Sequence, residues 1–239
     1  MKIESWIYYG VFAFSSTLAV YNGQRLFKSA DVHKSPWLGW VRKHQKMIFL
    51  LVFFSIVLAG LTFLRIQKMD LTALALLLIS GLVSVFYVFK IKGKNMRELP
   101  FIKIHLIAFT WVVVLIVFPL INENSSVQIL PMAFSHYLYV IAVTIPFDIR
   151  DLKYDAPNQK TIPQVIGVKA SKILAISLLV SFFCCMILQQ ENLAFNAVFY
   201  CAVLLQMILL AFMNEKRSDF YCAGLIDGTI ALLGLSYFL

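Results

Sequence analysis

Residues 129–155 read ILPMAFSHYLYVIAVTIPFDIRDLKYD, an apolar stretch that ends in three aspartates. The apolar part, 129–147, is long enough to cross a hydrocarbon layer of roughly 30 Å as a helix. Asp148, Asp151 and Asp155 follow at spacings of three and four, which would place them on one face of a continuing helix. The stretch therefore predicts a membrane-spanning helix with an acidic end, and we call its three aspartates the acidic triad.

The rest of the chain has the composition of a polytopic membrane protein. Of its 239 residues, 61% are hydrophobic and only 14% are charged, which is far outside the range of soluble domains. No loop is long enough to fold alone, so we expect one all-α transmembrane domain over residues 1–239, with about eight membrane helices. The apolar runs that predict these helices are 5–21, 47–64, 71–89, 104–121, 129–147, 173–188, 193–213 and 221–239.

The distribution of positive charge predicts the orientation in the membrane. Most Lys and Arg residues, 18 of 21, lie in four loops that fall on one side of such a bundle: 22–46, 90–103, 148–172 and 214–220. By the positive-inside rule this side is cytoplasmic, and both termini lie on the opposite side. The net charge of +9 is then a topology signal that favours contact with acidic membrane lipids and disfavours a nucleic-acid partner.

The acidic triad suggests a magnesium site at the cytoplasmic surface. Mg²⁺ takes oxygen ligands and typically binds through one or two carboxylates together with the phosphates of a substrate. The alternative is a solvated helix end at which the acids pair with neighbouring cations, namely Arg150, Lys153 and Lys160. Sequence alone leaves both interpretations open.

Residues 148–167, DIRDLKYDAPNQKTIPQVIG, resemble the second aspartate-rich motif of the UbiA-type intramembrane prenyltransferases. The pattern of that family is D-x-x-D-x-x-x-D, followed by a Lys, a Pro and a Gly four residues on. The acidic triad matches its three acids, and Lys160, Pro163 and Gly167 match the remainder. Residues 87–100 and the last apolar run resemble the family more loosely.

This resemblance implies a helical bundle around a central cavity that opens to the bilayer. It also implies Mg²⁺-dependent transfer of a prenyl group from a prenyl diphosphate to a lipophilic, for instance aromatic, acceptor. The acidic triad, Asp148, Asp151 and Asp155, would be catalytic and would hold the metal and the diphosphate. Basic residues that would balance the phosphate charge are Lys90, Lys92, Lys94, Arg97 and Lys160.

The first aspartate-rich motif of the family, N-D-x-x-D-x-x-x-D, is degenerate in this chain. Asn22 is kept, but the expected acids fall on Gly23, Leu26 and Ala30, and Arg25 stands among them. With about eight expected helices, the chain would be one helix short of the family's nine, and the missing helix would correspond to the first.

Two interpretations follow from the loss of these acids. In one, Asn22 and Arg25 bind the diphosphate directly, since a guanidinium can grip a phosphate through two hydrogen bonds. In the other, the site has lost its ionising power. The chain would then be a non-catalytic relative that binds a lipid or quinone, or that scaffolds a partner enzyme.

Asp227 is the remaining charged residue of interest, because it lies within the last apolar run. A charged Asp near the centre of a span costs about 2.5–3.5 kcal/mol on insertion scales. We therefore expect it to face the bundle as a buried polar bridge between helices, with a substrate contact or proton site as the alternative. Together with His105 and His136, it also suggests a small transporter as a third class of function.

Overall fold

The structure is a computed structural model that describes residues 6–28, 36–66, 69–87, 101–125, 127–155, 160–189 and 196–237. Every regular element within these ranges is a helix, which confirms the all-α fold class for them. Four of these helices are long and apolar enough to cross a membrane, and three shorter apolar helices accompany them. The chain is therefore a membrane protein, while the full count of about eight spans stays a prediction.

The helices follow one another along the chain and divide between two compact units. Unit 1 comprises the described residues of Met96–Val112 and Ser126–Leu239, and unit 2 comprises those of Lys2–Asn95 and Val113–Ser125. The helices are α1 (Trp6–Lys28), α2 (Pro36–Lys43), α3 (Gln45–Phe63), α4 (Leu71–Phe86), α5 (Ile102–Val112), the π-helix η3 (Val113–Val117), α6 (Phe118–Asn122), α7 (Ile129–Asp151), α8 (Ile162–Leu188), α9 (Ala197–Ala211), the π-helix η6 (Tyr221–Ile226) and α10 (Asp227–Ser236).

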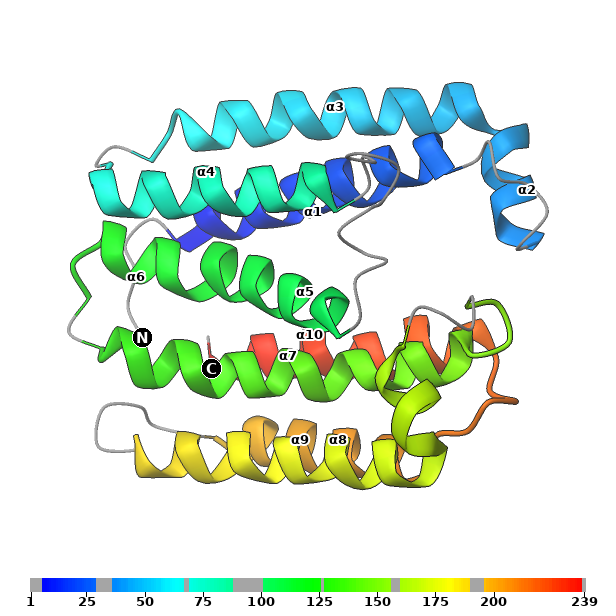
Figure 1. The fold of residues 1–239 in the computed structure, drawn as a ribbon. Helices are drawn as coiled ribbons and strands as arrows, with labels where there is room; N and C mark the ends of the chain where they lie inside the picture. Colours follow the sequence, from blue (N-terminus) through cyan, green and yellow to red (C-terminus); the bar gives the residue numbers. More distant parts are fainter. Residues whose placement is uncertain are drawn as a thin grey trace. The chain divides into compact units, whose positions relative to one another are not determined.

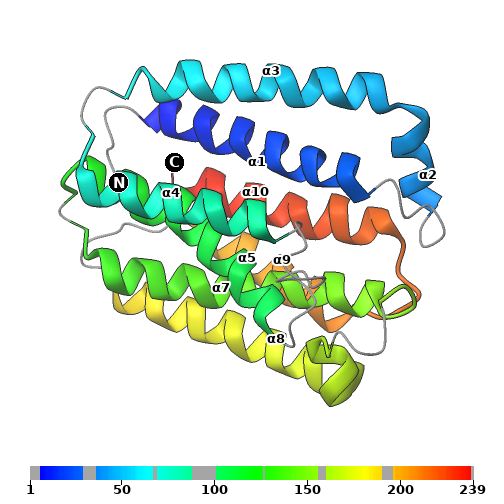
Figure 2. The same cartoon turned by 45° about the horizontal axis from the view of Figure 1, so that its top comes forward.

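In unit 2, α1 and α3 lie side by side and run in opposite directions, with α2 between them in the chain (Figures 1 and 2). Helix α1 continues through Asn22 and Arg25 to Lys28, so the prediction of a loop from residue 22 onward was wrong. Only 11% of the most apolar window of α3 is buried. The outer face of α3 is therefore suited to lipid, because apolar side chains need no other partner there.

A polar network ties one end of unit 2 together. The side-chain amide of Asn122 donates to the hydroxyl of Tyr9 at 2.6 Å and accepts from the backbone N–H of Asp70 at 2.8 Å. The Tyr9 hydroxyl donates in turn to Glu123 at 2.8 Å. Asp70 begins α4 by accepting from the N–H groups of Thr72 and Ala73, the usual role of an N-cap aspartate. Asn122 thereby fixes α1 and α4 to the end of α6.

A widened turn interrupts the apolar helix that runs from Ile102 to Asn122. The five residues of η3 form a π-helix directly before α6, which has Pro119 in its first turn. Proline lacks an N–H and crowds the carbonyl four residues earlier, which here belongs to Leu115. A π-turn at that point gives the chain room for the ring, so Pro119 explains the irregularity.

In unit 1, α7 is the most buried of the membrane-length helices. Of its most apolar window 56% is buried, twice the 28% of α8. Helix α8 lies along α7 in both views (Figures 1 and 2), and α9 packs against α8 and α10. Helix α5 also contacts α7. The acidic triad is therefore attached to the central helix of its unit.

The first turns of α8 are separated from its membrane-spanning part by a break at Gly167. This residue has φ 78° and ψ 162°, a conformation that is essentially restricted to glycine. Pro163 lies in the first turn of the short helix before the break, where its missing N–H costs nothing. Of the two residues expected in a loop here, Gly167 does interrupt the helix, whereas Pro163 is helical.

Candidate functional site

The candidate site is built at the end of α7. Asp148 and Asp151 belong to its last turn, and the helix ends at Asp151. Asp155 lies just beyond, where its N–H donates to the carbonyl of Asp151 at 2.9 Å. The expectation that one helix carries the whole acidic triad on one face was therefore wrong for its third member.

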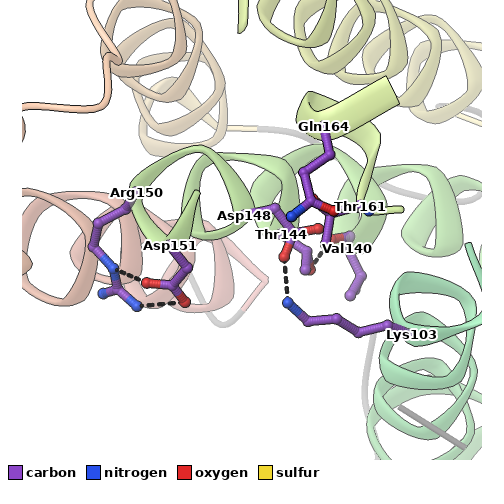
Figure 3. Close-up of polar contacts among 8 residues, drawn as sticks. All are labelled: Lys103, Val140, Thr144, Asp148, Arg150, Asp151, Thr161 and Gln164. Carbon is purple, nitrogen blue, oxygen red and sulfur yellow. Dashed lines mark hydrogen bonds and ion pairs between the residues drawn. The ribbon is translucent and has the colours of Figure 1, made fainter. Parts of the chain in front are cut away.

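Asp148 forms a buried ion pair with Lys103 from the first turn of α5 (Figure 3). The side chain of Asp148 is 3% exposed and that of Lys103 is 14% exposed. Burying two charges is stable only when they neutralise each other at close range. Lys103 is thus the functional residue that the sequence did not single out, because the two partners lie 45 positions apart.

Asp151 pairs with its neighbour Arg150 (Figure 3). The guanidinium donates through Nε to one carboxylate oxygen at 2.8 Å and through an Nη to the other at 3.1 Å. Its second Nη lies 3.4 Å from the carboxylate of Asp219, which precedes η6. The alternative of a helix end whose acids pair with nearby cations is therefore realised at Asp151, and Arg150 links α7 to the start of η6.

The surroundings of Asp148 are nearly filled. A cavity of about 10 Å³ lies beside the Lys103 pair, between the starts of α5 and α8, and its walls include Thr161 and Ile162. This is space for about one water molecule. Asp151 and Asp155 are each partly exposed, so they are more accessible from solvent than Asp148.

Lys160 and Thr161 form the entry to α8. Thr161 is the N-cap, and its N–H bonds to the side chain of Gln164 at 3.0 Å in a capping box. Lys160 is exposed and has φ 48°, in the left-handed region. A non-glycine residue held there costs of order 1–3 kcal/mol, and such strain concentrates at functional sites. This strain sets Lys160 apart from the other exposed lysines of the unit.

The donor set of the acidic triad fits a magnesium ion only in part. No group of three His, Cys, Asp or Glu side chains in the described ranges could hold a metal together. Asp148 is buried against Lys103, whereas Asp155 and Asp151, which pairs with Arg150, are both partly exposed and lie four residues apart. Two carboxylates with a substrate phosphate are a common ligand set for Mg²⁺. These two residues, and not the full triad, are the ones that would hold the ion.

The other predicted binding residues are placed as follows. Asn22 is buried, and its amide donates to the carbonyl of Leu18 in its own helix at 2.8 Å. Arg25 lies over the ring of Tyr21, 3.9 Å from its centroid. Both belong to unit 2, so a shared site with the acidic triad stays a prediction. Lys90 and Lys94 lie outside the described residues, as do Lys92 and Arg97.

Asp227 does not form the expected buried bridge. It is the first residue of α10, directly after η6, and it is exposed. The fully buried polar pair of this region is Gln206 of α9 with Thr229 of α10. His136 of α7 is buried and bonds both the carbonyl of Met132 at 2.8 Å and the hydroxyl of Tyr237 at 3.0 Å.

Positive charge in unit 1 gathers at the end of the acidic triad. Asp148 forms an ion pair with Lys103 at the start of α5, and Arg150 lies within ion-pair distance of Asp219 in the turn after α9. The start of α8 lines the cavity beside Asp148. These helix ends carry all eight Lys and Arg residues among the described part of the unit: Lys103, Arg150, Lys153, Lys160, Lys169, Lys172, Lys216 and Arg217.

Comparisons with models of known protein families, with curated proteins and with solved structures find no match for this chain. The resemblance to the UbiA-type prenyltransferases therefore rests on the residues of the motif. In addition, the structure shows which Lys and Arg residues lie at the same end of unit 1 as the acidic triad.

Proposed function

We propose that this chain is a UbiA-like membrane protein that binds a prenyl diphosphate beside Asp151 and Asp155 and transfers its prenyl group to a lipophilic acceptor. The observation that carries the proposal is the collection of paired charges at the end of α7, where a diphosphate could exchange with a carboxylate. The proposal includes about eight spans around a central cavity, with this end of unit 1 in the cytoplasm. The eight cations at this end support that orientation.

Arg150 is the residue best placed to receive the diphosphate. Its guanidinium already makes three contacts with carboxylates, and it offers the planar geometry that matches phosphate oxygens. Lys160 would add a second positive charge from the entry to α8. Mg²⁺ held by Asp151 and Asp155 would supply charge neutralisation on the leaving diphosphate. Asp148 and Lys103 would keep the end of α7 in place.

The test uses purified protein, labelled prenyl diphosphates of several lengths, Mg²⁺ and a membrane lipid extract. We expect release of diphosphate and a labelled lipid product. Asp151→Asn should reduce both at least tenfold, and Asp219→Asn is the matched control because it also touches Arg150 but lies outside the motif. Equal product from the two variants would refute the catalytic proposal.

A second variant separates binding of the substrate from the fold. Lys160→Gly removes the amine while glycine adopts φ 48° without strain. We expect it to keep the thermal stability of the parent and to weaken binding of the prenyl diphosphate several-fold. Unchanged binding would remove Lys160 from the site.

A non-catalytic relative is the second candidate, because Asp148 and Asp151 each have a protein cation as partner. Such a protein would bind a prenyl diphosphate, a lipid or a quinone, or would scaffold a partner enzyme, without a metal. Binding of a non-hydrolysable prenyl thiodiphosphate in EDTA, equal to that in Mg²⁺ and without turnover of the natural substrate, would favour this candidate.

A further inference from the structure

A second feature of unit 1 lies at the same end as the acidic triad but on a different surface. An open groove of about 530 Å³ lies between the start of the spanning part of α8 and the turn after α9. Its walls are Val168, Asn214, Glu215, Lys216 and Arg217. The groove contains no residue of the acidic triad and no residue of the proposed prenyl diphosphate site.

Arg217 is held in a fixed position in this groove. Its Nε donates to the carbonyl of Phe212 at 3.1 Å, and its guanidinium lies over the ring of Tyr221, 4.5 Å from the centroid. The Tyr221 ring is itself fixed, because it is buried and its hydroxyl donates to the carbonyl of Leu209 at 2.7 Å. An arginine that is already ordered loses little side-chain entropy when it binds an anion.

The fixed contacts of Arg217 use its Nε and one face of its guanidinium. The two Nη groups remain as donors, and together they match two oxygens of one phosphate. Asn214 shapes the turn by accepting from the N–H of Lys216 at 3.0 Å, and Lys216 contributes an exposed ammonium group. Glu215 is the opposing charge, and it limits how strongly the groove attracts anions.

A third cation lies close to the groove along α8. Lys172 is four residues after Val168 and therefore on the same helix face. Long side chains on a helix lean toward its N-terminus, which directs Lys172 back over Val168. Among the residues that line the groove, Lys216 and Arg217 outweigh Glu215, so its net charge is positive without Lys172.

The position of the groove indicates where its ligand comes from. It lies where α9 ends at Ala211 and where the spanning part of α8 begins, which is the depth at which an apolar helix leaves the hydrocarbon layer. Phosphate groups of lipids lie at this level, and basic pockets between membrane helices are typical sites for acidic headgroups. We propose that this groove binds the phosphate of an acidic phospholipid, with Arg217 as its principal ligand.

The test measures thermal stabilisation of the purified protein in detergent by short-chain lipids. Dioctanoyl phosphatidylglycerol should raise Tm in a saturable way, because a ligand that binds only the folded state stabilises it. Dioctanoyl phosphatidylcholine and glycerol phosphate should each give a much smaller rise. An equal rise with phosphatidylcholine would overturn the proposal, and an equal rise with glycerol phosphate would make the groove a site for soluble phosphates instead.

Three variants assign the effect to the groove. Arg217→Gln should weaken the apparent affinity for phosphatidylglycerol roughly tenfold, the usual scale of a lost charge-assisted contact. Arg65→Gln, an exposed arginine of unit 2, should leave it unchanged. Glu215→Gln should strengthen binding several-fold, a gain that impaired folding cannot imitate. Unaltered affinity in both Arg217→Gln and Glu215→Gln would overturn the proposal, whatever the outcome at the prenyl diphosphate site.

Discussion

The ion pairs at the end of α7 in unit 1 differ in kind from the hydrogen bonds around Asn122 in unit 2. In unit 1, Lys103 and Arg150 hold carboxylates through ion pairs at the end of α7. In unit 2, the neutral amide of Asn122 joins the hydroxyl of Tyr9 to the backbone of Asp70. These partners of Asn122 belong to the helix α1 and to the N-cap of α4, which the amide thereby holds in place.

This difference indicates which contacts within the protein a ligand can replace. An anion can take the place of a carboxylate beside Arg150, because the guanidinium binds phosphate equally well. No ligand offers the contacts that Asn122 makes to a backbone N–H and a tyrosine at once. We therefore expect the network of unit 2 to stabilise the fold and the ion pairs of unit 1 to take part in ligand binding. The following predictions test this difference.

The largest effect on stability should come from Lys103→Met. This change leaves the buried carboxylate of Asp148 without its cation, which costs about 3–5 kcal/mol in comparable buried pairs. The free energy of unfolding, measured by denaturant titration in detergent, should fall accordingly. Lys153→Met, at an exposed lysine of the same unit, is the control and should have almost no effect. The double variant Lys103→Met/Asp148→Leu should recover most of the loss, and a double variant as unstable as the single one would contradict the buried ion pair.

The next largest effect should come from Asn122→Leu. The variant removes two hydrogen bonds of a buried side chain, at about 1–3 kcal/mol for the polar groups that lose their partner. Tyr9→Phe removes the bonds of the hydroxyl to Asn122 and to Glu123 but keeps the bond from the backbone N–H of Asp70 to Asn122. Because Glu123 is partly exposed and can bond to water instead, the loss should be smaller. Equal losses from both variants would show that Asn122 does not act as the centre of the network. A loss of unfolding free energy larger than that of Lys103→Met would show that the Asn122 network stabilises the chain more than the Lys103–Asp148 pair.

Asp70→Ala should lower the free energy of unfolding by about 1 kcal/mol, the usual value of an N-cap. Its carboxylate accepts from the N–H groups of Thr72 and Ala73 at 2.8 and 3.0 Å, and alanine offers no acceptor. Asp70→Asn keeps an acceptor oxygen and should lose much less. Thermal unfolding followed by circular dichroism measures both, and equal losses would contradict the capping role.

The smallest effect should come from Arg150→Gln, despite its three contacts. The carboxylate side chains of Asp151 and Asp219 are 27% and 80% exposed, against 3% for Asp148. Water can therefore reach both carboxylates when the guanidinium is removed, and such a pair contributes about 0–1 kcal/mol. The same variant should weaken binding of a prenyl diphosphate roughly tenfold. A large loss of stability with unchanged binding would show that Arg150 stabilises the fold and does not bind the prenyl diphosphate.

Apolar runs predicted the helices well where hydrophobicity decides the structure. The runs 47–64 and 71–89 correspond to α3 and α4 within a few residues. The prediction was weaker where polar residues remain helical. Helix α1 continues past residue 21 to Lys28, since Gln24, Arg25 and Leu26 are good helix formers.

The candidate site could be predicted only in its local part. The positions of Asp148 and Asp151 at the end of a span followed from the sequence, whereas the helix before Gly167 did not, because residues 148–172 were expected to form a loop. The pairing of Asp148 with Lys103 did not, because spacing along one helix carries no information on partners from another helix. The exposure of Asp227 was also missed, since the cost of a charge in a span does not say which side of a helix faces a partner.

The break at Gly167 has a consequence for the thickness of membrane that this chain fits. An unbroken α8 of 27 residues would be about 40 Å long at 1.5 Å per residue. Without Ile162–Gly167, its first six residues, 21 residues remain, or about 32 Å, close to the hydrocarbon thickness of a typical bilayer. A single residue thus limits the straight part of α8 to about the thickness of the hydrocarbon layer, so that Lys169 and Lys172 can lie at its surface with little tilt of the helix.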